Sequence, residues 1–86
     1  MGNSMVWHVY IVKCHDKTFY TGITNNLLRR INDHNKGNGC RYTKYRRPVK
    51  LIHSEIYPTR SQAQKREYYI KSLKRADKLI LCGWVD

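Results

Sequence analysis

The sequence has few acidic residues for its length. Six Asp and Glu stand against 17 Lys and Arg among 86 residues, which gives a net charge of +11. Because a compact domain with so much charge of one sign repels itself, a polyanionic partner would relieve the repulsion. We expect nucleic acid, since basic side chains that contact phosphates release condensed counterions. An anionic membrane surface and a solvated basic surface without a partner are the alternatives.

The chain also lacks long apolar runs and paired cysteines. No stretch approaches the roughly 18 apolar residues that would span a bilayer, so no membrane-spanning segment is predicted. We expect nucleic acid rather than a membrane as the partner. The three cysteines form an odd set without paired spacing, which is a poor disulfide framework and favours a reducing, cytoplasmic compartment. A chain of 86 residues supports one domain over residues 1–86, with no room for a deep cofactor cleft. No small-molecule cofactor is therefore expected.

The pattern of apolar residues predicts an α/β (α+β) fold. Strands are expected at residues 6–14, 18–23 and 49–57, and helices at 25–36, 59–75 and 76–82. The order β-β-α-β-α-α predicts a small three-stranded antiparallel sheet flanked by helices. Leu27, Leu28 and Ile31 should face the sheet from the first helix. Ala63, Ile70 and Leu73 should do so from the longest helix.

The turn between the first two strands decides where two tyrosines lie. A three-residue loop at 15–17 places Tyr10 opposite Gly22, and Tyr10 and Tyr20 then become diagonal neighbours on one face. A two-residue loop would put them on opposite faces. Gly22 is unusual inside a strand, where glycine often marks the close approach of a ligand or another backbone.

Three polar residues on the predicted helices lie beside buried surface. Arg30 flanks the apolar face of the first helix and His34 lies one turn later, whereas Arg29 points outward. Two solvated side chains are the simpler interpretation of Arg30 and His34. Glu67 lies at the edge of the buried face of the longest helix, where a carboxylate needs a partner. That partner is either Lys71, at position i+4, or a metal ion.

The segment 41–50, RYTKYRRPVK, combines cations with tyrosines. Its cations can contact phosphates, and Tyr42 or Tyr45 could stack on an unpaired base. Nothing in the segment resembles base-specific readout, so we expect a preference for structure or little preference. The predicted nucleic-acid contacts are Arg41, Tyr42, Lys44, Tyr45, Arg46 and Arg47, together with Lys71 on the longest helix.

Several motifs together resemble the GIY-YIG nuclease family, and the resemblance covers essentially the whole chain. They are His8-Val9-Tyr10, Tyr20-Thr21-Gly22, Arg30 with His34 one turn later, and Glu67. The stretches 37–39, 41–43 and 46–49 are similar to those of small stand-alone bacterial members of the family. Ile23 stands where excision-repair members carry a lysine near the catalytic tyrosine.

The resemblance implies a metal-dependent endonuclease that hydrolyses DNA phosphodiester bonds in DNA repair or processing. Tyr20 would take the proton of the attacking water, while Tyr10 would position or relay it. Arg30 would lower the pKa of Tyr20 and contact the phosphate. His34 would orient Tyr20 or relay the proton, and Glu67 would hold a single Mg²⁺ or Mn²⁺.

A second hypothesis is a module that binds DNA or RNA and keeps the fold with little or no catalysis. Because Ile23 replaces that lysine, the tyrosine lacks one group that could activate its hydroxyl. This replacement leaves room for the second hypothesis. A domain that binds an acidic protein is a third, weaker interpretation. We expect a monomer or a weak dimer.

Overall fold

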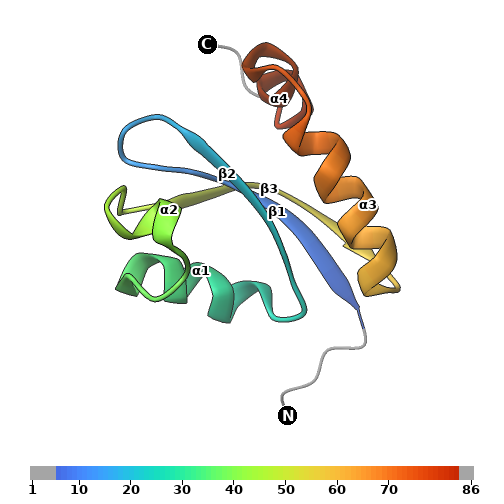
Figure 1. Cartoon of the computed structure of the whole chain (residues 1–86), viewed down its shortest axis with the longest axis horizontal. Coiled ribbons are helices and arrows are strands. Elements are labelled where there is room, and N and C mark those ends of the chain that lie inside the picture. Colours follow the sequence, from blue (N-terminus) through green and yellow to red (C-terminus); the bar gives the residue numbers. More distant parts are fainter. Residues whose placement is uncertain (1–5, 84–86) are drawn as a thin grey trace.

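The computed structural model describes residues 6–83, and its framework is a three-stranded antiparallel sheet (Figure 1). The strands are β1 (Trp7–Lys13), β2 (Phe19–Thr24) and β3 (Lys50–Tyr57), in the order β2-β1-β3. The helices are α1 (Leu27–Lys36), α2 (Arg41–Lys44), α3 (Arg60–Lys71) and α4 (Arg75–Leu81). Within residues 6–83 no helix is long and apolar enough to span a membrane. The predicted fold is confirmed, with the one-turn helix α2 as an addition.

The turn between β1 and β2 is the three-residue loop that places both tyrosines on one face. Lys17 donates its backbone N–H to the carbonyl of Cys14 at 2.9 Å and adopts left-handed backbone with a φ of 69°. A left-handed residue at the end of the loop is common in three-residue hairpin turns. Tyr10 is therefore paired with Gly22, and the ring centroids of Tyr10 and Tyr20 lie 6.4 Å apart.

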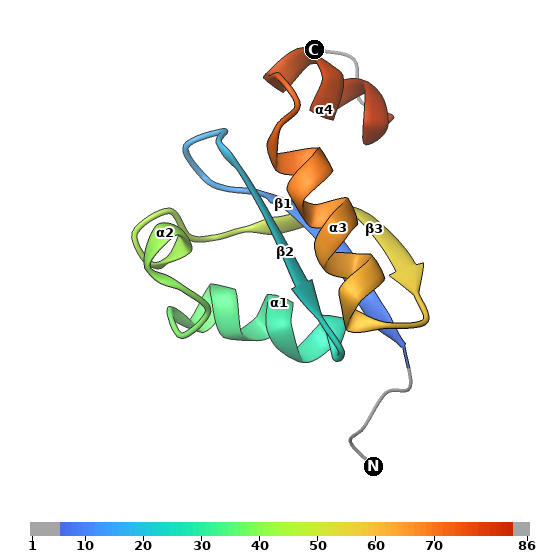
Figure 2. The same cartoon turned by 45° about the vertical axis from the view of Figure 1, so that its right-hand side comes forward.

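The sheet separates two hydrophobic clusters. Because successive side chains of a strand point to opposite faces, Val9 and Ile11 of β1 pack against α3 on one face. Tyr10 and Val12 pack against α1 on the other. The sheet therefore lies between α1 with α2 on one side and α3 with α4 on the other (Figures 1 and 2).

Helix α1 begins and ends at residues with strong capping preferences. The Asn26 side chain accepts the backbone N–H of Arg29 at 3.2 Å, and Gly37 ends the helix with a φ of 88°. Leu27 packs on the sheet, but Leu28 is 76% exposed. The prediction that Leu28 also faces the sheet is wrong, because it lies ~100° further around the helix and the narrow sheet leaves that side uncovered.

The segment predicted as one helix from residue 59 to 75 divides in two. Helix α3 begins after Thr59, the first residue of the predicted helix, whose hydroxyl oxygen accepts the N–H of Gln62 at 3.2 Å. It ends one turn early. There the Ser72 hydroxyl donates to the carbonyl of Tyr69 at 2.6 Å and occupies an acceptor of the last turn. Lys74 is then extended, with a ψ of 159°, and α4 begins after it.

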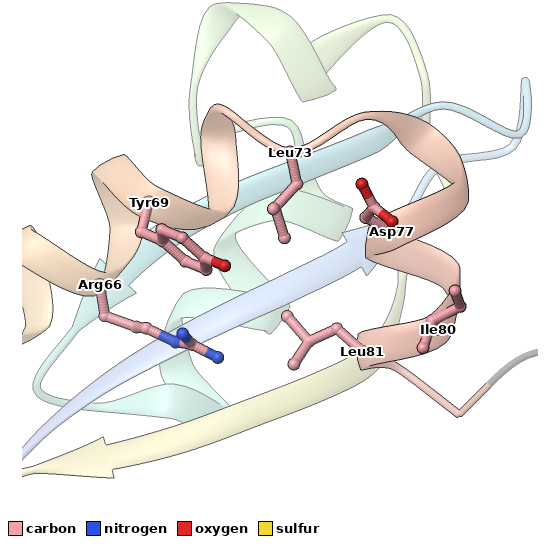
Figure 3. Close-up of a pocket in the computed structure, with 6 residues that line it drawn as sticks. All are labelled: Arg66, Tyr69, Leu73, Asp77, Ile80 and Leu81. Atoms are coloured by element: carbon pink, nitrogen blue, oxygen red, sulfur yellow. The ribbon is translucent and has the colours of Figure 1, made fainter.

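A pocket of about 430 Å³ lies between α3 and α4, on the side of the sheet away from α1 (Figure 3). Its lining residues are Arg66, Tyr69, Leu73, Asp77, Ile80 and Leu81. Leu73, which was predicted to face the core, is half-buried and lines this pocket. The pocket is thus separated by the sheet from the cluster that contains Tyr10.

Candidate active site

Tyr10 lies on the sheet face beneath α1 and is 1% exposed. Its ring crosses β2 at Gly22, where a Cβ atom would lie only 2.6 Å from the phenolic oxygen. Any side chain at this position would displace the ring, so the missing side chain makes room for the tyrosine. This contact explains why a glycine stands inside strand β2.

Helix α1 brings Arg30 and His34 to the Tyr10 hydroxyl, because residues at i and i+4 lie on one side of a helix. The phenolic oxygen and Nε2 of His34 are 2.8 Å apart. Nε of Arg30 donates to the same oxygen at 3.4 Å, and Nη2 donates to the carbonyl of Gly39 at 2.8 Å. Arg29 is exposed. The structure therefore assembles Tyr10, Arg30 and His34 into one group.

His34 is fully buried and held on both sides of its ring. Nδ1 lies 2.7 Å from Oγ1 of Thr43, which is also fully buried. The backbone of Gly39 packs directly on the imidazole, where any side chain would clash. Burial, and secondly the charge of Arg30, lower the pKa of His34 to about 4. The imidazole is therefore neutral at pH 7.

Tyr20 lies beside this group. Its ring packs against the edge of His34, with 5.3 Å between centroids, and stacks on Tyr42 at 5.8 Å. Burial, and secondly a hydrogen bond with Cys40, raise the pKa of Tyr20, while Arg30 acts in the opposite direction. Arg30 does act to lower the pKa of Tyr20, as expected, but burial outweighs the nearby cation and the net shift is upward.

Glu67 reaches the same region from α3. Its carboxylate pairs with Nζ of Lys71 at 3.2 Å, and that ammonium lies 5.9 Å from the ring centroid of Tyr20. Burial raises the pKa of Tyr10, Arg30 opposes the rise, and the charge of Glu67 adds to it. The carboxylate thus acts on the phenol electrostatically. Lys71, one of the two partners considered for Glu67, is present as an ion pair.

The two tyrosines considered for base stacking are in different environments. The ring of Tyr42 stacks on Tyr20 and has the guanidinium of Arg46 4.1 Å from its centroid. Tyr45 is 81% exposed, with Nζ of Lys44 5.5 Å from its centroid. Tyr42 therefore belongs to the wall of the site, and Tyr45 offers its ring to the solvent.

The predicted phosphate-binding cations also differ. Arg46 pairs with Asp16 at 3.0 Å, and Nε of Arg47 donates to the carbonyl of Lys44 at 3.0 Å. Arg41 and Lys44 are exposed, and in the described part of the chain neither belongs to an ion pair. Arg46 and Arg47 thus hold their own loop, while Arg41 and Lys44 remain accessible to a ligand.

A polar network on the opposite face of the sheet was missed at the sequence level. Glu55 accepts two hydrogen bonds from Arg66, at 2.8 and 3.1 Å, and one from Tyr57 at 2.7 Å. Nε2 of His53 lies 2.7 Å from the same carboxylate. Although burial opposes them, these contacts lower the pKa of Glu55 to about 2. The signal was the alternation of His53, Glu55 and Tyr57 along β3, which places them on one face.

Cys40 and Thr43 were also missed as members of the site. The stretch 41–43 contributed to the resemblance to the family, but the sequence indicated no role for its threonine. Cys40, Cys14 and Cys82 are free thiols, as predicted. Sγ of Cys40 lies 3.5 Å from Oγ1 of Thr43, so both residues line the side of the site formed by α2.

Comparison with known proteins identifies the family of the chain. Residues 6–79 match the GIY-YIG catalytic domain family. A UPF0213 protein of Clostridium perfringens is 54% identical over 74 residues, which cover 86% of this chain and 80% of that protein. A UPF0213 protein of Halobacterium salinarum is 49% identical over 71 residues, which cover 83% and 92% of the two chains.

Two solved structures are similar as well. The solution NMR structure of a protein from E. faecalis has a TM-score of 0.61 and 42% identity, over 91% of this chain and 83% of that one. The solution NMR structure of a UPF0213 protein from Bacillus halodurans has a TM-score of 0.60 and 38% identity, over 92% and 84%. Since the family match spans most of the chain and includes Tyr10, Arg30 and Glu67, this protein belongs to the GIY-YIG family.

Proposed function

We propose that this protein is a metal-dependent endonuclease that hydrolyses DNA phosphodiester bonds. The observation that supports this most is the hydrogen-bonded group of Arg30, Tyr10 and His34 in a chain of net charge +11. Phosphodiester hydrolysis needs a proton acceptor for the attacking water and positive charge for the developing oxyanion. In this group the hydroxyl of Tyr10 contacts a proton acceptor, His34, and a cation, Arg30.

In this proposal Tyr10, rather than Tyr20, passes the proton of the attacking water to His34. The Tyr10 hydroxyl is the one in contact with the imidazole, at 2.8 Å. Because burial raises the pKa of Tyr10, a free phenolate is unstable at neutral pH. The phenol therefore gives its proton to His34 as it receives one from water. A bound phosphate would assist, since its negative charge raises the pKa of the imidazole.

Arg30 suits the role of phosphate ligand. Nε is directed at Tyr10 and Nη2 at the carbonyl of Gly39, so the guanidinium is fixed before a substrate binds. Nη1 makes no hydrogen bond within residues 6–83. A guanidinium oriented in advance loses less side-chain entropy when it binds an oxyanion.

Glu67 is the residue that would hold a divalent ion. Within the described residues no group of three or more His, Cys, Asp or Glu side chains could hold a metal. Mg²⁺ is often bound by one or two carboxylates together with waters and substrate phosphates, and Glu67 fits such a site. Its carboxylate is paired with Nζ of Lys71 at 3.2 Å, so a metal ion would have to displace that ammonium. A bound Mg²⁺ or Mn²⁺ would stabilise the negative charge of the leaving oxygen.

Helix α2 supplies the surface for the polyanion. Arg41 and Lys44 would contact phosphates, and the exposed ring of Tyr45 would stack on an unpaired base. Neither kind of contact reads the edge of a base pair. The proposed substrate is therefore DNA recognised by its structure, such as a branch or a single-stranded end.

A nucleic-acid-binding module with little catalysis is the second candidate. Two observations favour it: burial raises the pKa of Tyr10 and of Tyr20, and Lys71 neutralises the carboxylate of Glu67. Both features would suit a surface that binds DNA or RNA without turnover.

Cleavage of supercoiled plasmid and branched DNA in Mg²⁺ or Mn²⁺ distinguishes the candidates. The endonuclease proposal expects cutting by the wild type that chelation abolishes and that Glu67→Gln lacks. Tyr20→Phe is expected to retain most of the activity, and Asp77→Asn, an exposed acid on α4, serves as the control. Cutting no faster by the wild type than by Glu67→Gln contradicts the proposal. Binding that weakens with salt, without cutting, would then support the second candidate.

A further inference from the structure

The hydroxyl of Thr43 lies at the far end of the hydrogen-bonded group that contains Tyr10. Thr43 is fully buried, and its Oγ1 lies 2.7 Å from Nδ1 of His34. The same oxygen donates to the carbonyl of Cys40 at 3.4 Å. A buried hydroxyl has one proton to donate. Since the Cys40 carbonyl can only accept, a hydroxyl proton directed at that carbonyl leaves Oγ1 to accept from the imidazole at 2.7 Å.

The direction of every other bond in the group follows from that step. If Nδ1 of His34 carries the proton donated to Thr43, then Nε2 of the neutral ring has a free lone pair. The Tyr10 hydroxyl donates to that lone pair across 2.8 Å. Arg30, which can only donate, supplies the bond that the phenolic oxygen accepts at 3.4 Å. The three hydrogen bonds are therefore all donated in the same direction along the group: from Arg30 to Tyr10, from Tyr10 to His34 and from His34 to Thr43.

We propose that Thr43 is a positioning residue that fixes His34 in the Nδ1-protonated tautomer and so keeps Nε2 available as the proton acceptor for Tyr10. The effect of this tautomer on catalysis rests on the proposed nuclease function. The tautomer itself does not. Thr43 acts through His34, and the loop before it helps: the backbone of Gly39 packs against the imidazole and its carbonyl holds Arg30.

A purely structural role would make Thr43 a well-packed buried side chain and nothing more. Thr43→Val tests this, because valine keeps the shape and removes the hydroxyl. Thr43→Ser restores the hydroxyl on a smaller side chain. Thr21→Val is the matched control, since Thr21 is a buried threonine of β2 on the face away from His34.

Long-range ¹⁵N–¹H NMR of the histidine rings reads the tautomer directly, with His34 assigned by its loss in His34→Gln. Wild type, Thr43→Ser and Thr21→Val are expected to show a protonated Nδ1 and an unprotonated Nε2. Thr43→Val is expected to show a mixed or inverted pattern. A wild type with a protonated Nε2, or a Thr43→Val ring identical to wild type, overturns the proposal. A protonated Nε2 in the wild type would overturn the proposal even if Thr43→Val does not fold.

Kinetics then tests the consequence for catalysis. Loss of the correct tautomer should lower kcat by roughly ten- to a hundred-fold in Thr43→Val, with KM little changed and activity restored in Thr43→Ser. Equal kcat values for Thr43→Val and wild type, beside an altered ring spectrum, would show that the tautomer has no catalytic role. If the wild type has no nuclease activity, the proposed function fails, while the NMR result still decides the role of Thr43.

Discussion

Tyr10 is positioned by two glycines as well as by its hydrogen bonds. A side chain at Gly22 would meet the phenol itself, and one at Gly39 would meet the imidazole of His34. Because both neighbours lack a Cβ atom, the aromatic ring and the imidazole can be buried within hydrogen-bond distance of each other. The cost of this arrangement lies in His34, because burial and the charge of Arg30 disfavour its protonated form and the charge of Asp33 opposes them only in part.

His34 should make the folded state sensitive to acid. Its pKa is about 4 in the folded protein against an ordinary value of 6.5. The unfolded chain therefore binds more protons between these values, and stability falls as the pH falls from 6.5 towards 4. Complete titration corresponds to roughly 3 kcal/mol of unfolding free energy.

Urea unfolding at pH 7 and at pH 4.5 measures this loss. Wild type is expected to lose more stability than His34→Gln, because the other titratable groups respond to pH in both proteins. An equal loss in the two proteins would mean that His34 is not buried in its neutral form.

Tyr42 of α2 and Tyr45, which follows that helix, had the same predicted role of stacking on a base, but their environments in the structure differ. Tyr45→Ala is expected to weaken binding of single-stranded DNA by about 1–3 kcal/mol, because the exposed ring stacks on a base. It should leave the melting temperature within a few degrees of wild type. Tyr42→Ala is expected to lower the melting temperature more, since Tyr42 packs on Tyr20. Fluorescence anisotropy and thermal unfolding of both variants provide the measurements, and a larger binding loss for Tyr42→Ala would reverse this assignment.

The predictable elements are those that local patterns specify. The hairpin follows from two runs of mostly β-branched and aromatic residues joined by a short polar turn. Helices α1 and α3 begin close to the predicted residues 25 and 59, at the caps Asn26 and Thr59. The break after Ser72 could not be predicted, because it depends on a hydroxyl that competes for a backbone carbonyl. Helix α2 has a single turn, which is too short for a hydrophobic period to appear in the sequence.

The site was predictable where spacing alone determines which residues meet. Arg30 and His34 share one side of α1 by their spacing, and Tyr10 faces Gly22 by strand register. The bond between Thr43 and His34 joins residues that only the folded loop brings together. The pKa of Tyr20 was also beyond reach, because its direction depends on how deeply the ring is buried.

At the scale of the whole molecule, the net charge of +11 should make DNA binding strongly dependent on salt. The affinity falls with salt in proportion to the number of phosphates contacted. Arg41→Gln, which removes an exposed cation, is expected to reduce the slope of log K against log salt by about 0.7–0.9. Arg46→Gln should reduce it less, because Arg46 is paired with Asp16. Salt titrations by anisotropy compare the two, and equal slopes for both variants would show that this ion pair opens when DNA binds.

In the proposed reaction the Tyr10 hydroxyl carries the proton of the attacking water to His34. The most direct test is the single-turnover rate of DNA cleavage by Tyr10→Phe, which keeps the buried ring and removes only the hydroxyl. A substrate that the wild type cuts in Mn²⁺ should be cut at least about 100-fold more slowly by this variant, while its fold and DNA affinity remain close to wild type. A Tyr10→Phe variant that cuts as fast as the wild type would contradict the claim.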